Sequence, residues 1–117
     1  LHDALPISLV NPFPPLQLLD RVGGTAAACA GRWDQAEEHF ARALRDAAST
    51  PLAVELPETR RALAEALLRR GSADDADRAR ELAGLAATGY DRLGMPRHAS
   101  LVRALVPVPG QGSRPDR

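Results

Sequence analysis

Between residues 16 and 106, apolar side chains recur every three or four positions, which is the spacing of one face of an α-helix. The first stripe begins at Leu16 and is ended by Gly31. We expect Asp34 to cap the next helix, because its carboxylate can accept unpaired backbone N–H groups. The apolar face of that second helix is formed by Ala36, Phe40, Ala43, Leu44 and Ala47. Residues 49–51 (Ser-Thr-Pro) end this first pair of helices.

The second half of the chain repeats this plan. A stripe through Leu63 and Leu67 ends at Gly71, and the polar segment SADD then provides capping groups for the next helix. The apolar face of that helix is formed by Ala79, Leu82, Ala83, Ala86 and Tyr90. A stop at LGMP is followed by a short fifth helix that ends at Val106. The pattern therefore predicts an all-α fold of two antiparallel helix hairpins and a terminal helix.

Both ends of the chain depart from the helical pattern. Residues 1–7 read LHDALPI, which is what a common sequencing adapter encodes in one reading frame. We therefore expect residues 1–8 to be an artefact and the natural polypeptide to begin upstream. Residues 9–15, which include NPFPP, predict an extended entry, and the Pro- and Gly-rich run at 107–117 predicts a disordered tail.

Composition narrows the classes of function. The formal net charge is zero, so no overall field attracts nucleic acid, and we expect no direct nucleic-acid contact. All basic residues are Arg, but equally numerous acids are interspersed with them, which favours a compositional bias over phosphate recognition. The lone Cys29 indicates a reducing, cytoplasmic environment. No apolar run approaches the roughly 20 residues of a membrane span, so no membrane contact is expected.

Constellations typical of enzymes are missing from the sequence. His39 is followed by no nearby metal-ligand partner, His98 stands alone near Arg97, and Cys29 has no histidine at a fixed distance. The glycines do not form a phosphate-binding loop after a strand. We therefore expect a non-catalytic protein with no metal and no cofactor.

Gly31 and Gly71 mark units about 40 residues apart, a spacing typical of helical solenoids. The segment GRWDQAEEHFARAL resembles the second half of a tetratricopeptide repeat. In this resemblance Gly31 is the turn, Trp33 the aromatic position, Ala36 the small residue where the helices cross and Phe40 the large plug, and the closing pair is Ala43 and Leu44. Gly23 and Gly24 stand where larger residues are usual, which suggests a loosely packed first hairpin.

The second unit departs further from the repeat. Its turn is about three residues longer, and alanines take the crossing, plug and closing positions, namely Ala79, Ala83 and Ala86. An alanine plug implies little burial in this hairpin. Residues 16–106 as a whole resemble the C-terminal end of the degenerate repeat tails of large bacterial signalling proteins, which include LuxR-type transcriptional regulators, predicted ATPases and multidomain adenylate or guanylate cyclases.

The resemblance implies a short right-handed solenoid in which upstream repeats cover the Leu16 helix and the last helix is a C-terminal cap. It also implies a concave interaction surface on the first helix of each pair, comprising Arg21, Thr25, Cys29, Glu58, Arg61, Glu65 and Arg69. The alternating charge there suits a protein, a peptide or a neighbouring domain of the same chain. Two alternatives stay open: a solvated face on a spacer, and the regulatory tail of a cyclase or ATPase whose catalytic head lies elsewhere.

Overall fold

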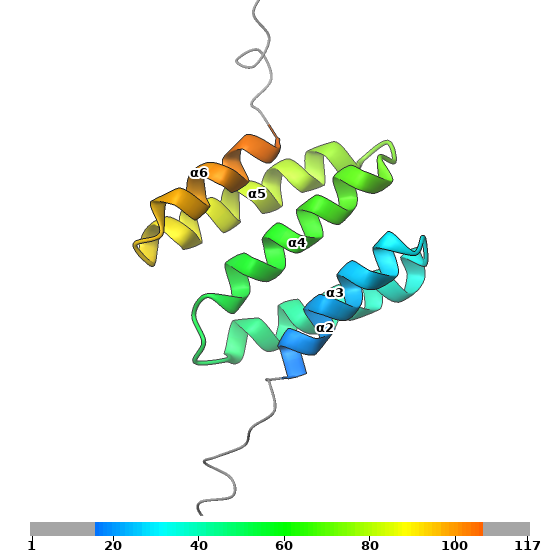
Figure 1. Cartoon of the computed structure of the whole chain (residues 1–117), viewed down its shortest axis with the longest axis horizontal. Coiled ribbons are helices and arrows are strands. Elements are labelled where there is room, and N and C mark those ends of the chain that lie inside the picture. Colours follow the sequence, from blue (N-terminus) through cyan, green and yellow to red (C-terminus); the bar gives the residue numbers. More distant parts are fainter. Residues whose placement is uncertain (1–15, 107–117) are drawn as a thin grey trace, which may run out of the picture.

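The computed structural model describes residues 16–106, and side chains from Leu19 onward. Within that range every regular element is a helix, so the all-α prediction is confirmed there (Figure 1). The helices are α2 (Leu16–Cys29), α3 (Trp33–Ser49), α4 (Glu55–Arg70), α5 (Asp75–Arg92) and α6 (Pro96–Leu105). The predictions for residues 1–8, 9–15 and 107–117 lie outside the described residues.

The helices are connected by short turns, and consecutive helices run antiparallel (Figure 1). Helix α2 packs on α3, α4 packs on α5, and α6 folds back along α5. Helix α4 lies at the centre and also contacts both α2 and α3. The second half of the chain is thus joined to the first mainly through α4.

The glycines predicted to end helices have a left-handed backbone conformation. Gly31 and Gly71 have φ values of +77° and +71°, in the left-handed region that side chains with a Cβ rarely adopt. The prediction that Asp34 caps α3 is wrong: the helix begins at Trp33, so the cap position is Arg32, two residues before Asp34, and Arg32 makes no side-chain cap hydrogen bond. Asp34 instead lies in the first turn of α3, where its negative charge interacts favourably with the positive end of the helix dipole.

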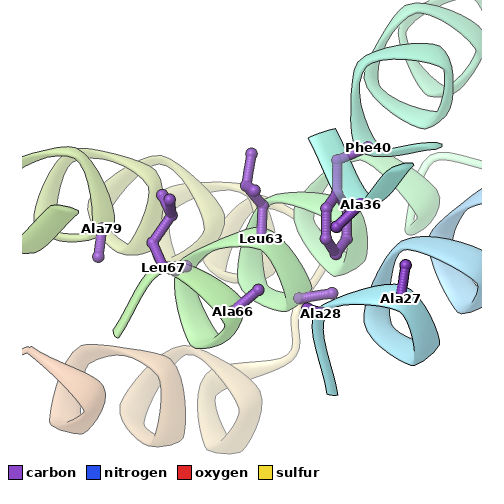
Figure 2. Packing of buried hydrophobic residues seen from close by; sticks show 10 residues of the cluster. Ala27, Ala28, Ala36, Phe40, Leu63, Ala66, Leu67 and Ala79 are labelled. Carbon is purple, nitrogen blue, oxygen red and sulfur yellow. The ribbon is translucent and has the colours of Figure 1, made fainter. Parts of the chain in front are cut away.

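Small residues dominate the main core (Figure 2). Phe40 is 1% exposed and lies beside Ala36, which is 2% exposed. Leu63 and Leu67 of α4 fill the space between the hairpins, surrounded by buried alanines. Because alanine side chains are short, the helices approach closely, and a few large residues provide most of the buried volume.

The expectation that the first hairpin is loosely packed is wrong. A Cβ placed on Gly24 would lie 2.9 Å from three carbon atoms of the Phe40 ring, and one on Gly23 would lie 2.9 Å from the His39 ring. Both glycines therefore mark a close approach of α2 to α3. Because glycine has no side chain to keep the two helices apart, the aromatic rings of His39 and Phe40 occupy the space beside Gly23 and Gly24.

The second hairpin buries more than its alanine plug suggested. Ala79, Ala83 and Ala86 are buried as expected, but Tyr90 is fully buried at the end of α5 and supplies the missing volume. Tyr90 forms a second apolar cluster together with Val102 of α6. This cluster holds α6 against α5.

A polar contact also joins the hairpins. Arg70 at the end of α4 lies over the Trp33 ring at 5.2 Å from its centroid and makes two 2.8 Å hydrogen bonds to the Asp75 carboxylate. The same carboxylate accepts the backbone N–H of Ser72 at 2.9 Å. A further ion pair of 3.5 Å joins Arg70 to Glu37 of α3. We call Trp33, Glu37, Arg70 and Asp75 the inter-hairpin cluster.

Candidate interaction groove

Two hollows lie on one face of the molecule, on either side of α4. The first, of about 360 Å³, lies between α2 and α4, and its lining includes Arg21, Thr25, Arg61 and Glu65. The second, of about 410 Å³, lies between α4 and α6, and its lining includes Glu58, Arg61 and Glu65. Because Arg61 and Glu65 line both hollows, we treat them as one groove that crosses α4, and call it the α4 groove.

Arg61 organises the floor of the groove. Its Nη2 donates to Glu58 Oε1 at 2.7 Å and its Nη1 donates to Glu65 Oε2 at 3.0 Å, both within α4. Its Nε donates to the hydroxyl of Tyr90 at 3.3 Å, which ties the floor to α5. Arg61 is therefore held by three groups of the same chain, one at each nitrogen.

These contacts shift the ionisation of the floor residues. Burial opposes the charged form of Arg61, but its hydrogen bonds to Glu58 and Tyr90 outweigh burial and raise its pKa. Burial likewise raises the pKa of Glu58, but the hydrogen bond and charge of Arg61 outweigh it, and the pKa of Glu58 is lowered overall. Burial is the main reason that the pKa of Tyr90 is raised. The floor thus carries fixed charges at neutral pH.

Exposed apolar side chains form the walls of the groove. Val22 of α2 is 55% exposed and Leu101 of α6 is 63% exposed, and each lines one hollow. Val102 and Leu105 extend the apolar wall of α6, and His98 lies at the same hollow beside the Tyr90 ring, 5.2 Å between ring centroids. The groove therefore combines a charged floor with apolar walls on opposite sides.

The structure brings together most of the predicted concave residues. Five of the seven line the groove: Arg21, Thr25, Glu58, Arg61 and Glu65. Cys29 and Arg69 are exposed near the ends of their helices and line neither hollow. Arg21 also makes a 3.3 Å ion pair with the buried Glu55, which fixes α2 against α4.

Sequence reasoning missed the wall formed by α6. That helix was interpreted as a cap, yet His98, Leu101, Val102 and Leu105 all line the second hollow. The available signal was the width of its apolar face: Leu101 and Val102 are adjacent, so they point about 100° apart and cannot both face α5. Val102 is fully buried, and Leu101 is left for the groove.

Metal-binding clusters and membrane-spanning helices were also sought among the described residues. Among residues 16–106, no group of three or more His, Cys, Asp or Glu side chains is arranged to hold a metal ion. In the same range, no helix is both long and apolar enough to cross a membrane.

Comparison with known proteins adds no relative. No family model, no curated protein and no solved structure matches this chain. The geometry of the groove is therefore the basis for assigning a function.

Proposed function

We propose that this chain is a non-catalytic interaction module made of two tetratricopeptide-like hairpins, α2–α3 and α4–α5, which wind as a right-handed solenoid with α6 as the C-terminal cap. The buried Ala36 and Phe40 support this proposal, because they occupy the crossing and plug positions of the repeat. The contacts of α4 with both α2 and α3 also support it, since stacked repeats contact their neighbours in this way.

The α4 groove is the observation on which the interaction role depends. Its lining comes from α2, α4 and α6, the helices that begin each successive unit. Exposed Val22 and Leu101 provide apolar contact area, and the ion pairs of the floor provide polar groups of fixed orientation. Protein interfaces combine the same two ingredients, an apolar centre and orienting polar groups. A segment of another protein, or of a neighbouring domain, fits this surface.

We further propose that the module belongs to the C-terminal part of a larger bacterial signalling or transcriptional regulatory protein in the cytoplasm. The resemblance of residues 16–106 to the repeat tails of such proteins supports this assignment. In that setting the groove holds a partner protein or another domain of the same chain.

Peptide display on the full chain tests the interaction role. Short random peptides would be selected on the wild-type protein, and the affinities of the selected sequences measured by calorimetry. We expect Leu101→Gln to weaken them by about tenfold or more, because it replaces an apolar contact of the groove wall with a polar group.

The matched control is Leu85→Gln, which changes an exposed leucine of α5 outside the groove, and we expect it to leave the affinities unchanged. Selected peptides that bind the Leu101→Gln protein as tightly as wild type would show that the groove is not the binding surface.

A further inference from the structure

The hollow between α4 and α6 has two chemically different sides. The α6 side presents Leu101, Val102 and Leu105, and the α4 side presents Glu58, Arg61 and Glu65. A side chain entering this hollow would therefore have an apolar surface along one side and charged groups along the other.

The polar side has more capacity to accept hydrogen bonds than to donate them. Arg61 has five N–H groups, and three of them, one on each nitrogen, already donate within the chain to Glu58, Glu65 and Tyr90. Glu58 and Glu65 each accept from Arg61 through one oxygen, and a carboxylate offers about four lone-pair sites over its two oxygens. The side chain of Glu65 is also 39% exposed at the mouth of the hollow.

The balance of charge points in the same direction. Two carboxylates face one guanidinium on the polar side, which leaves an excess of one negative charge. An acidic side chain would meet this excess, and Arg61 would offer it only the two N–H groups that do not already donate to Glu58, Glu65 or Tyr90. A basic side chain would meet unoccupied carboxylate oxygens, and its aliphatic stem would cover the apolar wall of α6.

We infer that the hollow between α4 and α6 receives a long basic side chain, arginine or lysine, of the polypeptide that occupies the α4 groove. The inference depends on the proposed function and specifies the chemistry of the partner. Leu101 and Leu105 contact the stem, and Glu58 and Glu65 accept from the cationic head, while Arg61 keeps the two carboxylates apart and oriented.

The test uses N-acetylated, C-terminally amidated tripeptides Leu-Arg-Leu, Leu-Gln-Leu and Leu-Glu-Leu, titrated into the isotope-labelled full chain and followed by NMR. We expect the arginine tripeptide to bind about tenfold more tightly than the glutamine tripeptide, since two partly exposed carboxylates each contribute a few-fold. Its shifts should map to α4 and α6, and the glutamate tripeptide should bind most weakly.

A charge-matched pair of variants separates this site from general electrostatics. Glu58→Gln with Glu65→Gln should bring the arginine tripeptide to within about twofold of the glutamine one. Glu38→Gln with Glu81→Gln removes the same charge from exposed positions of α3 and α5 and should leave the preference intact. If the first variant does not fold, the comparison of the three tripeptides on wild type decides alone.

Two results would overturn the inference: equal affinity of the arginine and glutamine tripeptides for wild type, or an equal loss of preference in both double variants. Equal affinities with shifts still confined to α4 and α6 would reject the basic anchor and leave the interaction groove in place. The proposed function fails separately, if the displayed peptides bind the Leu101→Gln protein as tightly as wild type.

Discussion

Replacing Gly24 by alanine tests the close packing of the first hairpin. Two effects oppose each other in Gly24→Ala. Alanine in a helix interior is favoured over glycine by roughly 0.5–1 kcal/mol, because glycine loses more backbone freedom on folding. Against this, the new Cβ would lie 2.9 Å from Cδ2, Cε2 and Cζ of Phe40.

The Phe40 ring cannot easily move away from such a methyl group. It is 1% exposed and packed among buried alanines, so displacing it would disturb the main core. Forcing extra atoms into a packed core typically costs about 1–3 kcal/mol. This cost exceeds the gain in helix propensity, and we expect Gly24→Ala to lower the free energy of unfolding by about 1 kcal/mol.

Gly84 provides the control for propensity alone. It lies within α5, and a Cβ at this position would meet nothing within 4 Å. Gly84→Ala should therefore raise the free energy of unfolding by roughly 0.5–1 kcal/mol. The difference between the two variants isolates the packing cost, about 1–3 kcal/mol. Urea denaturation followed by far-ultraviolet circular dichroism measures both values.

A double variant connects the effect to the ring. Phe40→Leu removes the aromatic carbons that a Cβ on Gly24 would approach, so Gly24→Ala should be less destabilising in that background, with a coupling of about 1 kcal/mol. If Gly24→Ala stabilises the protein as much as Gly84→Ala does, the two helices do not approach as described and the argument fails.

Three further predictions concern buried polar groups. The hydroxyl of Thr59 is buried and meets no hydrogen-bond partner among the described residues, so Thr59→Val should stabilise the protein by about 1 kcal/mol in a urea titration; a loss of stability would show that the hydroxyl is in fact bonded. The hydrogen bond from Arg70 lowers the pKa of Asp75 to about 2 from its usual 3.8, so the stability that it contributes is complete above the usual pKa and is lost as the pH falls towards 2. That loss should be about 1–2 kcal/mol after allowance for solvent screening, and should be missing from Asp75→Asn. Tyr90→Phe removes the acceptor for Arg61 Nε and should cost about 1 kcal/mol in thermal unfolding.

Local signals account for the parts of the fold that were predicted correctly. The three- to four-residue spacing of apolar side chains is sufficient to place helices, and Gly31 and Gly71 end them through a backbone conformation that needs no tertiary partner. The buried positions of Ala36 and Phe40 also follow from a single helix face.

The errors concern residues whose role depends on distant partners. From the sequence, Gly24 suggested a loosely packed first hairpin, because no local signal shows that the Phe40 ring occupies the space above this glycine. The contact of Arg70 with Trp33 was not predicted, since it forms only when the second hairpin packs on the first. The groove wall at Leu101 was missed for a similar reason: a helix assumed to be a cap needs only one apolar face.

The same limits apply to the candidate site. The positions on α2 and α4 could be proposed from the repeat resemblance, and five of those seven residues line the groove. The hydrogen bonds that hold Arg61 in place could not all be predicted, because one of its partners, Tyr90, lies 29 residues away.

The inter-hairpin cluster has a practical consequence, because Trp33 is the single tryptophan of the chain. The fluorescence of the Trp33 indole responds to the Arg70 guanidinium above it, which moves away when the two hairpins separate. The far-ultraviolet circular dichroism signal, in contrast, reports the loss of helical structure in every helix. Stacked units are coupled only through their neighbours, and they can come apart before they unravel. Comparing the two signals during unfolding therefore shows whether the hairpins unfold together or one at a time.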